Sequence, residues 1–226
     1  PSNDLTPGTL YCFNWTNTAA VSIKAGATSD NSGSVTTRAT GPSVIDTSNY
    51  ATASITDDQI AVSATVPQAF SFALSGNTDS LGNLSSGSVT SSPTPRTATV
   101  NTNAKNGWLV WSKDSNSGLN SASAAATISS TTPGSNSILS AGTEGYNMGV
   151  ASSQVGGTGT LTVAAPFVNG AGQGGGLDTS LRTIASSTGT ADTAVLTLTN
   201  HASISASTPA ATDYADTITV VGAGLF

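Results

Sequence analysis

The chain has 226 residues, of which only 8% are charged, and its formal net charge is −6. The six lysines and arginines are scattered between Lys24 and Arg182, which argues against nucleic acid as a partner because phosphate binding requires clustered cations. A mean hydropathy of +0.02 with 37% apolar residues indicates a chain that folds, and no apolar run approaches the roughly 20 residues of a membrane span.

The first predicted element is a strand over residues 9–16, TLYCFNWT, with two apolar faces. One face carries Tyr11, Phe13 and Trp15, and the other carries Leu10 and Cys12. Such a strand must be covered on both sides, so either the body of the same chain or another molecule folds over it. Cys12 is the only cysteine, which excludes an intramolecular disulfide and favours a buried thiol.

A polar stretch, residues 26–58, follows and is interpreted as edge strands and loops, with weak strands at 20–25 and 34–40. Beyond it, apolar residues alternate over residues 60–66 and again over 70–74, with Pro67 between them. We interpret these two segments as a pair of core strands.

Short period-two runs bounded by turn residues continue to the end of the chain. They lie at residues 96–102, 107–113, 146–152, 159–168, 194–200 and 216–221. Residues 121–127 are predicted to be a loop or one short turn. The glycine run at 170–176 is predicted not to be a regular strand but a mobile loop or a place of close backbone approach.

Convincing helical periodicity occurs nowhere, so the predicted fold is all-β. We expect a single jelly-roll or immunoglobulin-like sandwich with an N-terminal exchange strand. Residues 1–26 would be the candidate donor strand and tether, and residues 27–226 the sandwich body. Because the chain begins at Pro1 without Met, we expect a processed, secreted protein located outside the cell or at its surface.

The C-terminal segment 207–226 resembles the closing strand of the spore coat U family of secreted fimbrial-type domains. The positions that match the pattern P-A-G-x-Y-x-D-T-[VIL]-T-V and its C-terminal aromatic are Pro209, Ala210, Tyr214, Asp216, Thr217, Ile218, Thr219, Val220 and Phe226. Ala211 and Thr212 stand where that pattern has glycine. The resemblance implies a fimbrial domain whose subunits polymerise by lending a strand to a neighbour. In composition the chain is also similar to biofilm fibres of the TasA type.

Residues typical of catalysis or metal binding form no recognisable set, and we expect neither enzymatic activity nor a cofactor. His201 is the only histidine, which excludes a multi-histidine metal site, and we interpret it as a solvated turn residue after a strand. Calcium ligation by Asp57 with Asp58, or by Asp213 with Asp216, stays an alternative without the spacing of a calcium loop. Asn83 is the better candidate of two glycosylation sequons.

The expected function is that of a structural subunit, assembled head to tail into a filament or pilus by β-strand addition between copies of the chain. The predicted donor plugs are Leu10, Tyr11, Phe13 and Trp15, with Cys12 in the same strand. They would enter an acceptor groove beside Phe70, Phe72, Ile218 and Val220. The alternative is a monomeric surface adhesin or carbohydrate-binding module, in which Trp108 or Trp111 stacks on surface glycans.

Overall fold

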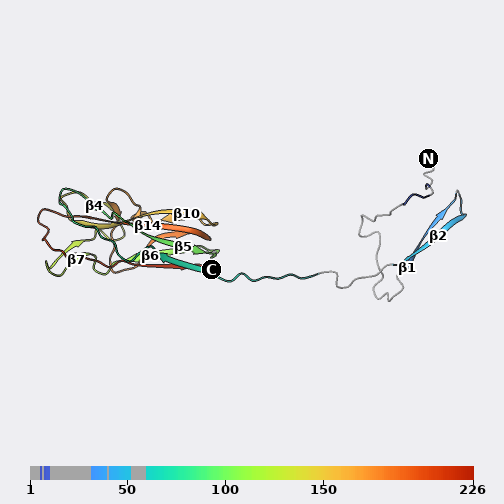
Figure 1. The fold of residues 1–226 in the computed structure, drawn as a ribbon, viewed down its shortest axis with the longest axis horizontal. Coiled ribbons are helices and arrows are strands. Elements are labelled where there is room, and N and C mark those ends of the chain that lie inside the picture. The colour runs from blue at the N-terminus through green and yellow to red at the C-terminus, as the bar shows by residue number, and fades with distance from the viewer. Residues whose placement is uncertain (1–5, 7, 11–31, 40, 52–59) are drawn as a thin grey trace. The chain divides into compact units, whose positions relative to one another are not determined.

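The computed structural model describes residues 6, 8–10, 32–39, 41–51 and 60–226. The chain divides into two compact units, residues 1–65 and 66–226 (Figure 1). The larger unit therefore begins at Val66 in the structure, whereas the sequence placed the start of the body at residue 27.

In the first unit, the described strands form one antiparallel hairpin of β1 (Ser32–Arg38) and β2 (Val44–Ala51). The hydroxyls of Thr36 and Thr47 share a hydrogen bond of 3.1 Å across the pair, and an irregularity in register lies between Thr37 and Arg38. β1 covers residues 34–38 of the predicted weak strand at 34–40, whereas the predicted weak strand at 20–25 lies outside the described residues. A two-stranded hairpin is marginally stable without a covering layer.

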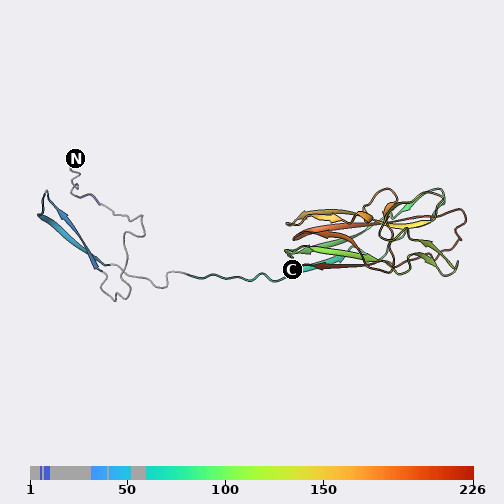
Figure 2. The same cartoon turned by 180° about the vertical axis from the view of Figure 1, so that it is seen from behind.

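The second unit contains two packed antiparallel sheets, and the strands of both sheets lie roughly along one common axis (Figure 1 and Figure 2). The larger sheet has the order β3-β5-β14-β10-β12-β9, and β4 also pairs with β14. Its strands are β3 (Phe70–Leu74), β4 (Thr90–Ser91), β5 (Arg96–Thr102), β9 (Asn136–Ile138), β10 (Gly145–Gly156), β12 (Gln173–Gly175) and β14 (Ala191–Ser203).

The smaller sheet has the order β11-β13-β6-β15, and a separate hairpin pairs β7 with β8. The strands are β6 (Trp108–Lys113), β7 (Gly118–Ser121), β8 (Ala126–Ser129), β11 (Leu161–Val163), β13 (Arg182–Ser187) and β15 (Thr219–Gly224). One short 3-10 helix, Ala165–Phe167, follows β11. Among the described residues, no helix has the length and apolarity needed to cross a bilayer.

The core lies between the two sheets and follows the alternation of their strands. Val100 and Leu196 from the larger sheet are fully buried, and so are Trp108, Val110 and Ile184 from the smaller one. Trp111, three residues after Trp108, is only partly buried on the opposite face of β6. The prediction of an all-β sandwich is confirmed.

The glycine run contains a strand, β12 (Gln173–Gly175), so the prediction that it forms no regular strand is wrong. A Cβ atom at Gly174 would lie 2.4 Å from the carbonyl carbon of Met148, and one at Gly175 would lie 2.7 Å from the ring of Phe167. The predicted close backbone approach is therefore present, and it occurs inside the sheet because only glycine fits there.

The interpretation of residues 60–66 as a core strand is also wrong. Ile60, Val62 and Val66 are 89%, 88% and 80% exposed, and residues 60–66 pair with no described strand. The alternation of apolar residues identified a segment suited to a half-buried strand, but a period-two pattern does not specify what covers it. Only the second segment of the predicted pair, β3, joins the sheet.

Candidate functional site

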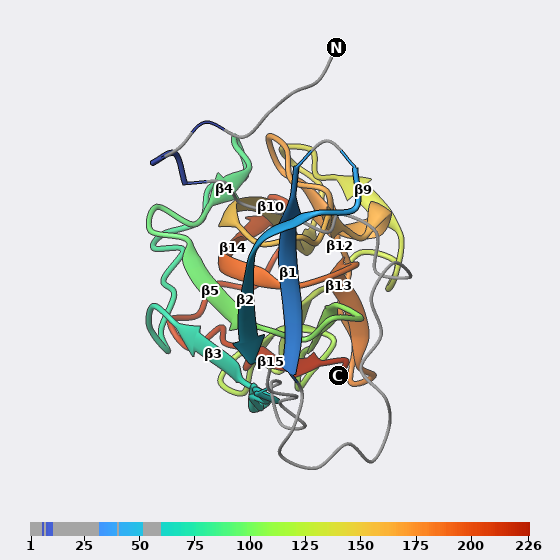
Figure 3. The ribbon, with the colours of Figure 1, turned by 90° about the vertical axis from the view of Figure 1, so that its right-hand side faces the viewer.

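In the 66–226 unit, the edge strand β3 of the larger sheet lies next to the edge strand β15 of the smaller sheet. Among the described strands, β3 pairs only with β5, and β15 pairs only with β6, so each has one edge without a ladder partner. Figure 3 views the unit end on, with β3 and β15 in its lower part. An edge strand presents N–H and C=O groups that a further strand can pair with.

At one end of this gap the two edges are in contact. Phe70 and Phe72 of β3 lie over Gly222 and Gly224 of β15, where a Cβ atom at Gly222 would come within 2.7 Å of the Phe72 ring. β3 and β15 run antiparallel where they meet, because Phe70 lies near Gly224 and Phe72 lies near Gly222. Glycines in β15 thus make room for two aromatic rings that seal this end of the sandwich.

Towards the other end of β3 the gap opens into a groove of about 940 Å³. Leu74 at the end of β3 lies on one wall and Ile218 and Val220 lie on the other, while Leu198 and Met148 of the larger sheet form part of the lining. Further apolar lining residues are Leu81, Leu84, Leu119, Ile128, Tyr146, Ile204 and Tyr214. Asp79, Arg96 and Asp216 also line the groove, so it offers apolar surface for the side chains of a strand beside polar and charged groups.

Polar groups at the groove are joined in a hydrogen-bonded chain. The hydroxyl of Tyr146 donates to Oδ1 of Asn200 at 3.3 Å, and Nδ2 of Asn200 donates to the Asp79 carboxylate at 2.8 Å. Ser92 donates to the other oxygen of Asp79 at 2.6 Å. Burial raises the pKa of Tyr146, so its hydroxyl stays protonated and acts as the donor. The network links Tyr146, Asn200, Asp79 and Ser92 and so orients these polar groups.

One wall of the groove is the segment that leads into β15, and Tyr214 holds it in place. Its hydroxyl donates to the carbonyl oxygen of Pro209 at 2.9 Å, which forms a corner in the chain. The carboxylate of Asp216 then accepts hydrogen bonds from Ser115 and from the backbone N–H of Thr217. These contacts bring Ile218 and Val220 into the wall.

The four predicted acceptor residues therefore lie together around the gap between β3 and β15. Ile218 and Val220 line the groove, whereas Phe70 and Phe72 close its end, and all four pack against the main core. Of the predicted donor residues, Leu10 is exposed, while Tyr11, Cys12, Phe13 and Trp15 lie outside the described residues. Asn83 is exposed and lies at the groove, where a glycan would obstruct entry.

His201 is not a solvated turn residue, contrary to its interpretation from sequence. It lies within β14, is buried, and its Nδ1 is 2.7 Å from the hydroxyl of Ser91, while its Nε2 is 3.2 Å from Oδ1 of Asn169. Burial lowers the pKa of His201, so the imidazole is neutral, donating from Nε2 and accepting at Nδ1. The ring connects β4 to the segment that carries Asn169.

The predicted calcium candidates have separate protein partners. Asp213 accepts hydrogen bonds from the hydroxyls of Ser121 and Ser123 and from the Ser123 N–H, which lower the pKa of that carboxyl. Asp57 and Asp58 lie outside the described residues. In the part of the chain that the structure describes, no three His, Cys, Asp or Glu side chains form a metal-binding group.

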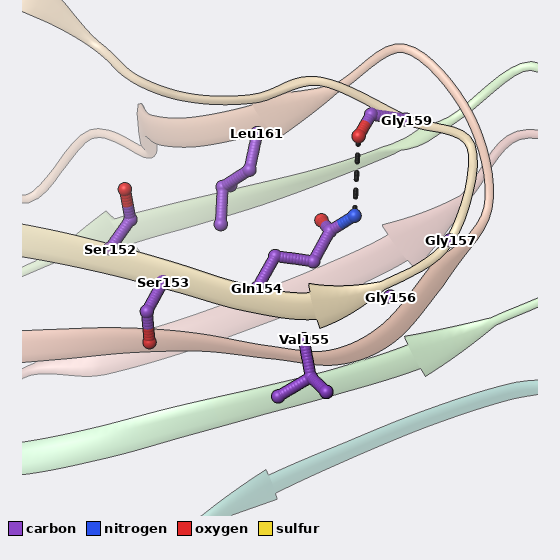
Figure 4. Close-up of a pocket in the computed structure, with 8 residues that line it drawn as sticks. All are labelled: Ser152, Ser153, Gln154, Val155, Gly156, Gly157, Gly159 and Leu161. Atoms are coloured by element: carbon purple, nitrogen blue, oxygen red, sulfur yellow. Dashed lines mark hydrogen bonds between the residues drawn. The ribbon is translucent and has the colours of Figure 1, made fainter.

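A second hollow lies at the C-terminal end of β10 and measures about 410 Å³ (Figure 4). Gln154 donates from Nε2 to the carbonyl oxygen of Gly159 at 3.2 Å across it. Its lining, residues 152–157, 159 and 161, contains no charged or nucleophilic group other than serine hydroxyls. The groove beside β3 is therefore the better candidate for function.

No protein-family model matches the chain, and no curated protein or solved structure matches it. The resemblance of segment 207–226 to spore coat U thus stays a prediction from its residues.

Proposed function

We propose that the protein is a structural subunit that assembles head to tail into an extracellular filament by β-strand addition. The observation that carries the proposal is the apolar groove of about 940 Å³ between two sheet edges that no described strand pairs with. A strand inserted there gains main-chain hydrogen bonds from an edge and buries alternate side chains in the groove.

The walls of the groove have a two-residue period, which matches the alternate side chains of a strand and which a pocket for a small ligand does not require. Ile218, just before β15, and Val220 within it face inward, while Thr219 and Val221 are exposed. On the facing strand Leu74, which lines the groove, has the same parity as Phe72. Each wall thus has the two-residue period of a strand. Burying three or four apolar side chains at about 1.5–3 kcal/mol each supplies a sizeable association energy before ordering costs.

Composition supports a filament in a second way. Only 8% of the residues are charged, so copies of the chain repel one another weakly when packed along a fibre. The few charges also leave few sites for trypsin-like proteases, which suits a protein outside the cell.

Negative-stain microscopy of the purified full chain, combined with light scattering over a concentration series, tests the proposal. We expect fibres of uniform width for the unmodified chain and monomers for Leu74→Lys, which places a charge at the groove. Val155→Lys is the matched control, because Val155 is exposed near the C-terminal end of β10 and lies outside the groove. Monodisperse single particles of the unmodified chain at every concentration would overturn the proposal.

A further inference from the structure

Residues 60–66, IAVSATV, have the pattern of one strand that lacks its cover. Ile60, Val62, Ala64 and Val66 share one face, and small or polar residues occupy the other. The three large members of the apolar face are each at least 80% exposed, and the segment forms no hydrogen bond with any described residue. A segment with exposed apolar side chains at every second residue could fill a groove that receives the alternate side chains of a strand.

The chain becomes fixed immediately after this segment. Asn103 donates from Nδ2 to the carbonyl oxygen of Pro67 and accepts from the N–H of Ala69, both at 2.8 Å. The carbonyl oxygen of Ala69 accepts from the Asn103 N–H and from the Thr102 hydroxyl. Both backbone groups of Ala69 are therefore in use, and β3 starts at the next residue.

This attachment fixes the chain at the Phe70 end of β3. The groove opens at Leu74, four residues and about 13 Å along β3 from Phe70. For residues 60–66 to enter it, the chain would have to reverse within Pro67–Ala69 and run back along β3. That reversal would break the hydrogen bonds with Asn103. A second copy of the chain can supply the same segment without any such change.

We propose that residues 60–66 are the donor strand, and that they enter the groove of a second copy with Ile60, Val62 and Val66 facing its apolar lining. Ala64, the small member of the same face, lies between the two valines. The inference rests on the proposed strand addition and deepens it, because it replaces residues 9–16 as the donor. The opposite face, Ala61, Ser63 and Thr65, remains towards solvent.

Single substitutions in the full chain separate the two faces of the segment. Val62→Asp should weaken assembly at least about tenfold, since an apolar plug becomes a charge in an apolar groove. Ser63→Asp is the matched control, placing the same charge one residue away on the face left towards solvent, and should assemble as the unmodified chain does. Because Val62 is exposed, the 66–226 unit should unfold at an unchanged temperature in both variants.

Peptide binding then identifies the donor directly. The chain carrying Val62→Asp retains its own groove, so a labelled peptide of residues 59–67 should bind it, and binding should be lost when Leu74→Lys is added. A labelled peptide of residues 9–16 should not bind. Mixing the Val62→Asp chain with the Leu74→Lys chain should give capped pairs rather than fibres, because only one donor and one groove remain between them.

The outcomes distinguish this inference from the proposed function. If Val62→Asp chains form fibres and the 9–16 peptide binds at the groove, strand addition holds and residues 60–66 are not the donor. If the unmodified chain stays monomeric and neither peptide binds, strand addition itself is wrong. Equal loss of assembly in Val62→Asp and Ser63→Asp would also overturn the inference, because it would then not matter which face of the segment carries the charge.

Discussion

The hydroxyl of Tyr214 donates a hydrogen bond of 2.9 Å to the carbonyl oxygen of Pro209, five residues earlier in the chain. It closes a corner in the segment that leads into β15. Because Tyr214 also packs against Ile128 and Tyr146, its ring belongs to the second apolar cluster of the unit as well as to the groove. The corner joins this apolar cluster to the wall of the groove.

Tyr214→Phe should therefore keep the ring packing and lose only the hydrogen bond. We expect the free energy of unfolding of the 66–226 unit to fall by about 1 kcal/mol, the usual net value of one such bond. Urea denaturation followed by tryptophan fluorescence measures the change. Tyr50→Phe, in β2 of the other unit, is the control and should leave this transition in place. Identical midpoints for both variants would show that the corner does not contribute to stability.

Gly222→Ala should disturb the contact between the two sheet edges. The added methyl group would lie 2.7 Å from Cδ2 of Phe72 and 3.2 Å from Cζ of Phe70, so the rings must move. We expect a loss of about 1–3 kcal/mol, as for other overpacked cores. Gly87→Ala is the control, since the nearest atom to its Cβ, the Ser85 hydroxyl, is 3.6 Å away. Thermal unfolding of both variants, with no shift for Gly222→Ala as the contrary result, decides the matter.

Gly174→Ala should detach the outer strands of the larger sheet. Its Cβ would lie 2.4 Å from the carbonyl carbon of Met148 and 2.5 Å from the nitrogen of Gly149, and these are backbone atoms that cannot rotate away. We expect a loss of about 3 kcal/mol or more and faster amide exchange in β12 and β9. Hydrogen exchange with mass spectrometry provides the measurement. Protection of β9 as strong as in the unmodified chain would contradict the close approach.

The unfolding free energy should depend on pH through His201. Burial lowers the pKa of His201 below its ordinary value of 6.5, so the unfolded chain takes up this proton first as the pH falls. Stability is therefore complete above about pH 6.5 and declines below it, by at most about 1.4 kcal/mol per pH unit, until the folded state also binds the proton. His201→Gln should remove this decline between pH 6.5 and 5 in denaturant titrations. An unchanged slope in that variant would assign the decline to other groups.

Local patterns in the sequence predicted those features whose cause is local. The period-two run at residues 107–113 predicted the strand that the structure has as β6, because such a pattern depends only on residues a few positions apart. Apolar parity suggested that Phe70, Phe72, Ile218 and Val220 belong to one region, and these residues do lie together, although nothing in either strand showed that Phe70 and Phe72 would close one end of the groove.

The remaining features depend on residues distant in sequence. Gly174 lies in a strand whose backbone approaches that of Met148 closely. His201 is buried, and its ring nitrogens form hydrogen bonds with Ser91 and Asn169. For residues 60–66, periodicity predicted a strand but could not tell a strand paired in a sheet from a segment that pairs with no described strand. Pairing partners and covering layers are properties of the assembled fold, so short-range patterns do not contain them.

The groove beside Leu74 and the exposed face of Ile60 and Val62 are different surfaces of one chain. A contact between unlike surfaces is not self-complementary, so a fibre built from it has a direction. One terminal subunit presents an empty groove, and the subunit at the opposite terminus presents an uninserted segment. Growth at the two ends then differs, and a short peptide that fills the groove would block only one of them, which makes fibre length adjustable by a capping partner.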